Sequence, residues 1–133
     1  MFEINESPTT DDINFLTEKL NNEHPEKGKA YPFEIFLRDK SNNIIAGCSG
    51  CVVFGSIHTD QLWVDPNSRG QGLGRKLMDA VHSYGKKQDC ILSTLFTMSF
   101  QVPDFYKKLG YKIDFIRNGY KENSNYIYFS KEL

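Results

Sequence analysis

The chain has 133 residues, 39% of them hydrophobic and 14% aromatic, and its formal net charge is −1. This length is typical of one domain, so residues 1–133 are expected to share a single core. The aromatic content argues against disorder, and the near-neutral charge provides no broad surface for nucleic acid or an anionic membrane. No apolar run is long enough to cross a bilayer, and residues 1–6 do not form a signal peptide. We therefore expect a soluble, cytoplasmic protein.

The first half of the chain predicts a helix followed by antiparallel strands. Phe2–Ile4 is predicted as a short first strand, and Ser7-Pro8 is predicted to begin an amphipathic helix that ends near Asn22. After a polar loop, alternating apolar residues predict strands at 33–38, 44–54 and 58–64. The turns between these three strands are short, which favours an antiparallel meander.

The second half predicts a change to alternating helices and strands. Apolar residues from Leu73 to Tyr84 recur at helical spacing, and an apolar strand follows at 90–96. A strand, a helix and a strand in this order form a crossover, so the fourth and fifth predicted strands, 58–64 and 90–96, should be parallel. A short helix at 103–110 and strands at 112–117 and 126–131 complete an α/β fold with a mixed, mostly antiparallel sheet of six or seven strands.

The three cysteines are too few for a disulfide framework. Cys48 and Cys51 form a CxxC pair, but they lie inside the predicted strand 44–54, where an odd separation points them to opposite faces. A zinc site needs about four ligands, and Cys90 and the three histidines show no second paired spacing. We therefore expect buried free thiols and no metal site.

A glycine-rich segment stands between the strand 58–64 and the following helix. It reads Arg69-Gly70-Gln71-Gly72-Leu73-Gly74-Arg75. Bare backbone that leads into a helix N-terminus presents unpaired amides and a positive dipole, which together favour an anion such as a pyrophosphate. A Walker A loop is excluded because Gly74 is followed by Arg75 instead of lysine, and the glycine spacing does not match the dinucleotide fingerprint. A tight turn that binds nothing is the alternative.

This segment resembles the acyl-CoA pyrophosphate loop, [Q/R]-x-x-G-x-[G/A], of the GNAT superfamily of N-acetyltransferases. The residues before it, Leu62-Trp63-Val64-Asp65-Pro66, resemble the end of that family's fourth strand, and Phe105–Tyr111 resembles its later Y-x-x-x-G-[F/Y] segment. The resemblance implies acetyl-CoA as donor, a primary amine of a small molecule or peptide as acceptor, and direct transfer in a ternary complex. It also implies a splay between the fourth and fifth strands and a homodimer formed through the last strand.

The resemblance further implies which residues contact the cosubstrate. The backbone of Leu62, Trp63 and Val64 would pair with the pantetheine arm, and the segment from Arg69 to Arg75 would hold the diphosphate. Many members carry Asn seven residues before the tyrosine and Ala four before it, whereas this chain has Ser99 and Val102. Ser99 is therefore expected to make fewer contacts with the pantetheine. The predicted cofactor-binding set is Leu62, Trp63, Val64, Arg69, Gly70, Gln71, Gly72, Leu73, Gly74, Arg75 and Ser99.

Transfer from a thioester to an amine needs a neutral amine, donors for the carbonyl oxygen and a proton for the leaving thiolate. Tyr106 is the predicted acid, although its helical stripe with Phe105 and Leu109 would also explain it as a core residue. His58 and Asp60 are two residues apart in a strand, so they should share a face, with His58 as base and Asp60 as charge anchor. The alternative for His58 is a solvated strand residue. Backbone N–H near Val64 is predicted to hold the oxyanion.

Two other function classes were weighed against this enzyme. A non-catalytic acyl-CoA sensor would keep the glycine loop and bind CoA without releasing thiol. A nucleic-acid binder lacks the expected basic surface. The acceptor is expected near residues 21–32 and 118–125, whose mixed polar character does not identify it.

Overall fold

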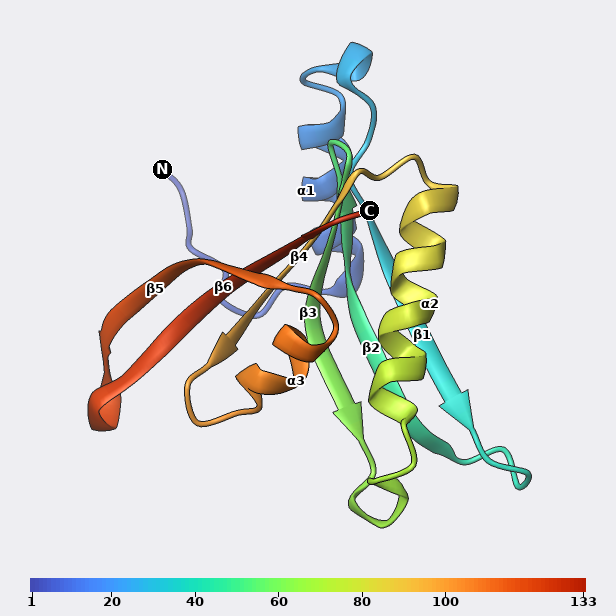
Figure 1. Ribbon diagram of the computed structural model, residues 1–133. Helices are drawn as coiled ribbons and strands as arrows, with labels where there is room; N and C mark the ends of the chain where they lie inside the picture. The colour runs from blue at the N-terminus through green and yellow to red at the C-terminus, as the bar shows by residue number, and fades with distance from the viewer.

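The computed structural model describes residues 1–133 as a six-stranded sheet with three α-helices (Figure 1). The helices are α1 (Thr10–Asn21), α2 (Leu73–Lys87) and α3 (Pro103–Lys108). The strands are β1 (Tyr31–Arg38), β2 (Ile44–Val53), β3 (Ser56–Val64), β4 (Leu92–Met98), β5 (Lys112–Tyr120) and β6 (Ser124–Glu132). No helix combines the length and the apolar character needed to span a membrane.

The strand order is β1-β2-β3-β4-β6-β5, and only β3 and β4 are parallel. The predicted α/β class with a mixed sheet is confirmed. The predicted seventh strand is wrong, because Phe2–Ile4 is exposed and pairs with nothing, which leaves β1 at the sheet edge. The parallel pair is therefore the third and fourth strands, not the fourth and fifth.

Helix α1 begins two residues later than predicted. Thr9 is its N-cap: the Thr9 hydroxyl accepts a hydrogen bond from the Asp12 amide, and the Asp12 carboxylate accepts one from the Thr9 amide. This reciprocal pair is a capping box, which satisfies two otherwise free amides. The helix buries none of its residues, and Ile13, Leu16 and Leu20 stay more than half exposed. The predicted amphipathic face therefore lies outside the core.

The core lies between the sheet and α2, which covers one face of β1–β3 (Figure 1). Ile57 of β3 and Phe129 of β6 belong to the same core cluster as the apolar stripe of α2, and all are almost completely inaccessible to water. Burial of each such side chain contributes about 1.5–3 kcal/mol. This layer fixes β3 against α2, and a short connection, made of the 3-10 helix Pro66–Ser68 and the glycine-rich segment, joins these two elements. The stripe of α2 consists of Leu77, Met78 and Val81.

The three cysteines are free. Cys48 and Cys90 are buried, and Cys51 is half-buried on the other face of β2. Burial raises the pKa of Cys48 to about 11, so this thiol stays protonated at neutral pH. No three His, Cys, Asp or Glu side chains gather as a metal site.

Candidate active site

The strands β3 and β4 separate halfway along their length. Their parallel pairing runs from Ser56–Leu92 to Thr59–Leu95 and stops there, although β3 continues to Val64. A bulge lies at the same place on the other side of β3, because Ser49 pairs with Gln61 whereas Gly50 pairs with Thr59. Asp60 is the extra residue, and a bulge of this kind bends its strand. The result is an open gap between the second halves of β3 and β4.

The edge of β3 that faces this gap carries free backbone donors. The Asp65 amide donates to the Ile45 carbonyl of β2 at 2.8 Å. Because successive amides of a strand point to opposite sides, those of Leu62 and Val64 point away from β2 and into the gap. These donors are available to a ligand that lies beside β3.

The glycine-rich segment leads from this strand into α2 through two left-handed residues. Gly70 and Gly72 have φ of +78° and +77°, and a side chain at either would meet nothing within 4 Å. Glycine is therefore required by the backbone conformation and not by lack of space. Gly72 is the N-cap of α2 and provides no side-chain cap, so the first amides of the helix are free to bind an anion.

A cavity of about 800 Å³ joins the gap to this helix N-terminus. Its wall holds three cations, Arg69, Arg75 and Lys108, and no carboxylate. Gly74 forms part of the wall, and a Cβ there would approach the Phe105 ring to 3.1 Å. Nine of the eleven predicted cofactor-binding residues line the cavity: Leu62, Trp63, Val64, Arg69, Gly70, Gly72, Leu73, Gly74 and Arg75.

Two predicted cofactor-binding residues lie outside this cavity. Gln71 is exposed and does not line it. Ser99 is tied to β6 instead, because its hydroxyl accepts a hydrogen bond from the Asn125 amide at 2.9 Å. The far wall, which lies outside the predicted cofactor-binding set, is formed by α3 and the residues around it. It contains Gln101, Val102, Phe105, Lys108 and Leu109.

Tyr106 lies in α3 next to Phe105 of the cavity wall, but it does not itself line the cavity. Its ring packs against Phe105 at 5.0 Å, Phe129 at 5.9 Å and Tyr111 at 6.0 Å between centroids, and the residue is 8% exposed. Burial, with a smaller contribution from the Cys48 thiol, raises the pKa of Tyr106. The phenol is therefore neutral at physiological pH and can donate a proton or a hydrogen bond.

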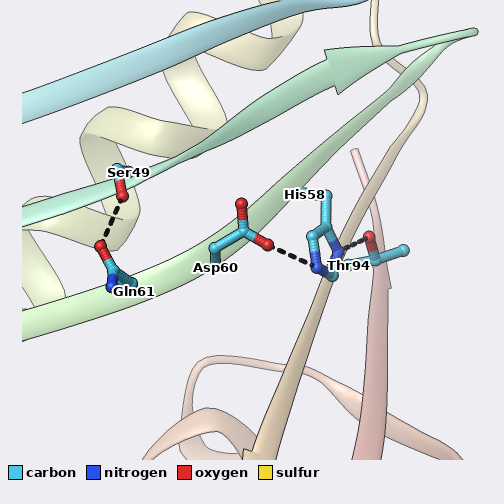
Figure 2. Close-up of polar contacts among 5 residues, drawn as sticks. All are labelled: Ser49, His58, Asp60, Gln61 and Thr94. Atoms are coloured by element: carbon cyan, nitrogen blue, oxygen red, sulfur yellow. Dashed lines mark hydrogen bonds and ion pairs between the residues drawn. The ribbon is translucent and has the colours of Figure 1, made fainter. Parts of the chain in front are cut away.

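His58 lies on the opposite face of the sheet. It alternates with Ile57 and Thr59, which are both buried in the core beneath α2. Its Nδ1 lies 2.7 Å from the Thr94 hydroxyl, and its Nε2 lies 3.3 Å from the Asp60 carboxylate (Figure 2). The predicted pair of His58 and Asp60 is therefore in contact. Thr94 was not singled out in the sequence, because its role depends on the pairing of two distant strands.

The surroundings of His58 favour a neutral imidazole. Burial lowers the pKa of His58, and the charge of Asp60 opposes this shift without overcoming it. The Asp60 side chain is 58% exposed, so its carboxylate faces the open side of the sheet. The two residues predicted as base and acid, His58 and Tyr106, therefore lie on opposite faces of the sheet.

Comparison with known proteins agrees with this architecture. The family model described as an acetyltransferase (GNAT) domain matches residues 32–113. A Streptomyces morookaense protein named blasticidin-S acetyltransferase is 33% identical over 89 residues, which are 64% of this chain and 65% of that protein. The alignment thus spans slightly less than two thirds of that relative.

Solved structures extend the similarity over the whole chain. An acetyltransferase from Bacillus cereus superposes with a TM-score of 0.79 at 26% identity and covers 98% of both chains. An acetyltransferase from Bacillus anthracis, solved in complex with acetyl coenzyme A, has a TM-score of 0.64 at 20% identity. That match covers 69% of this chain and 57% of the other and concerns the fold alone.

A sheet that opens between two parallel strands, beside an uncapped helix N-terminus, defines the class of this protein. The family match covers more than half of the chain and includes the gap and the glycine-rich segment. This chain belongs to the GNAT acetyltransferase family.

Proposed function

We propose that this protein is an N-acetyltransferase, which transfers the acetyl group of acetyl-CoA to a primary amine of a small molecule or peptide. The observation that carries the proposal is the gap between β3 and β4, with a cationic cavity on one face and His58 with Asp60 on the other. The similarity to a blasticidin-S acetyltransferase supports an amine-bearing small molecule as acceptor.

The cationic cavity fits the cosubstrate. The free amides at the start of α2, together with Arg69 and Arg75, would hold the diphosphate, and each charged hydrogen bond contributes about 1.5–3 kcal/mol. The amides of Leu62 and Val64 would pair with the pantetheine arm. This arrangement would direct the thioester toward the point where β3 and β4 separate.

His58 and Asp60 would bind and deprotonate the acceptor. The Asp60 carboxylate attracts the ammonium form of the amine, and His58 is neutral because burial lowers its pKa. The Asp60 carboxylate only accepts, so in the free protein it favours a proton on Nε2. Because the Thr94 hydroxyl can donate or accept, the tautomer that carries its proton on Nδ1 becomes available once the ammonium lies beside Asp60. In that tautomer Nε2 is free to take a proton from the ammonium, and Asp60 stabilises the resulting imidazolium.

The transfer then needs one bond to form and one to break. The amine nitrogen bonds to the carbonyl carbon while backbone N–H of β3 stabilises the negative charge that develops on the carbonyl oxygen. The carbon–sulfur bond breaks, and Tyr106 donates its proton to the sulfur. The ammonium loses two of its three protons. One leaves through His58 to solvent, and the other restores the proton of Tyr106 through solvent. The products are therefore the acetamide, free CoA thiol and one proton.

A thiol-release assay tests this proposal. Acetyl-CoA is offered with chemically diverse amines, blasticidin S among them, and the released CoA is measured for the wild type and for His58→Ala and Tyr106→Phe. We expect release with at least one amine and a large loss in both variants. Binding of CoA without release from any amine would instead identify an acyl-CoA sensor.

A further inference from the structure

A second cavity, of about 470 Å³, lies on the His58 face of the sheet. The register of β1–β3 arranges its residues in two rows across the strands. Glu34, Ser49 and Gln61 are paired partners in the first row. Phe36, Gly47 and Trp63 form the second row, and the Phe36 ring lies over Gly47, where an added Cβ would approach it to 2.5 Å. The cavity therefore has an aromatic row beside a polar row.

This cavity adjoins the proposed reaction site. It shares Leu62 and Trp63 with the cationic cavity, so the two meet at the edge of β3 that borders the gap. Gln61, which pairs with Ser49 through a 3.2 Å contact, follows Asp60 along β3 (Figure 2). A molecule whose amine lies at Asp60 and His58 can therefore extend into this cavity.

The charge of the cavity is opposite to that of the cosubstrate site. Glu34 is its one acidic residue, no basic residue lines it, and the Glu34 carboxylate forms no salt bridge. Arg38, the one basic residue of β1, donates to the Asn42 carbonyl in the following turn and does not line the cavity. Trp63 and Phe36 are 49% and 47% exposed, so their rings are accessible to a ligand. A carboxylate beside exposed aromatic rings favours a cation.

We infer that the acceptor carries a second cationic group, an ammonium or guanidinium, which binds this cavity between Glu34 and the rings of Phe36 and Trp63. The inference rests on the proposed function, since it names the acceptor class of the same site. Glu34 lies on β1 and Asp60 lies on β3, with β2 between them. Two inter-strand distances set the two carboxylates roughly 10 Å apart. Elongated diamines and amino-guanidines fit this spacing, and monoamines leave Glu34 unpaired.

Steady-state kinetics with two matched amines test the inference. 1,8-Diaminooctane and octylamine have the same carbon chain and differ in the second ammonium. With saturating acetyl-CoA, we expect kcat/KM to be about tenfold or more higher for the diamine, and Glu34→Gln to remove most of this preference without changing kcat/KM for octylamine. The control variant Glu132→Gln changes an exposed residue at the end of β6 and should alter kcat/KM for neither amine. Equal use of both amines, or an equal loss for both in Glu34→Gln, would overturn the inference.

A binding measurement separates this inference from the proposed function. Trp63 is the one tryptophan of the chain and lines both cavities, so CoA is kept saturating and a further change in fluorescence reports on the second cavity. In CoA-saturated protein, we expect the diamine to give a saturable change that octylamine does not give and that Glu34→Gln weakens. Such a change without turnover of any amine would refute the proposed function and retain the cation site. Turnover of octylamine with no response of Trp63 to the diamine would refute the cation site alone.

Discussion

The Nδ1 atom of His58 lies 2.7 Å from the Thr94 hydroxyl oxygen, one register pair before β3 and β4 separate. The two residues are direct neighbours in the parallel pairing, so the contact is fixed by the last paired segment of the sheet. It orients the imidazole with Nε2 toward Asp60 and the open gap. The paired part of the sheet thus holds Nδ1 of the ring, and Nε2 faces the side from which a substrate would approach.

The acid limb of the pH–rate profile should reflect protonation of the His58 imidazole. Burial lowers the pKa of His58 from 6.5, so the neutral base persists below that pH and kcat/KM should fall only as the pH drops further. We expect His58→Ala to lower kcat/KM by about 10²–10⁴ and to abolish this limb. Profiles of the wild type and the variant, measured with one amine, provide the comparison. An unchanged acid limb in His58→Ala would remove the imidazole from the mechanism.

Tyr106→Phe should separate the chemistry of the hydroxyl from the packing of the ring. The phenylalanine keeps the contacts with Phe129 and Tyr111, so CoA affinity and the free energy of unfolding should change little. Turnover should fall by about 10²–10⁴ if the phenol protonates the thiolate.

Tyr111→Phe is the matched control for this substitution. It removes the hydroxyl that contacts His82 and Ser93 in the core, at 2.7 Å each, and leaves Tyr106 in place. We expect it to lower stability and to leave the turnover of the folded protein nearly unchanged. Normal turnover in Tyr106→Phe would reduce that tyrosine to a packing residue.

Gly72→Ala should weaken CoA binding through the backbone. A side chain at φ +77° is strained by about 1–3 kcal/mol, and relief of that strain would rotate the first amides of α2 away from the anion. We expect the Kd for CoA, measured by calorimetry, to rise about tenfold or more. Gly28→Ala places a side chain at φ +84° and ψ −175°, a conformation that essentially only glycine adopts, in a loop outside the cavity. It should cost at least as much stability with no change in Kd, and an unchanged Kd in Gly72→Ala would refute the assigned anion site.

The buried His82 should make stability depend on pH. Its Nε2 lies 2.7 Å from the Tyr111 hydroxyl, and burial, aided by Lys131 and Lys86, lowers its pKa to about 4. Because the unfolded chain binds this proton near pH 6.5, stability is complete above that pH and falls as the pH drops toward 4, by about 3 kcal/mol in all. Urea unfolding across this range should show the fall, and His82→Gln should flatten it. Equal slopes in the two proteins would contradict the prediction.

Local patterns in the sequence were sufficient for most of the fold. The spacing of Leu73, Leu77 and Val81 predicted α2, and the crossover rule then made the flanking strands parallel. The start of α1 was predicted at Ser7 because serine before proline is a common cap. Thr9 is the cap instead, because Asp12 stands three residues after it and completes the capping box, whereas Thr10 stands three after Ser7.

The parts of the site that depend on strand register could not be predicted. The bulge at Asp60 is visible only when β2 and β3 are paired, and the contact of His58 with Thr94 joins residues 36 apart in sequence. The contact of Ser99 is of the same kind. Its hydroxyl accepts a hydrogen bond from the Asn125 amide of β6, 26 residues away, which the family pattern around Tyr106 does not reveal.

The two cavities lie on opposite faces of one strand, at Leu62 and Trp63. Cosubstrate and acceptor would therefore reach the reacting atoms by separate routes, and neither would block the exit of the other. Such a geometry imposes no compulsory order of addition or departure. A covalent hybrid of the two substrates would occupy both cavities at once, and it would pass from one to the other through the gap that already separates the second halves of β3 and β4.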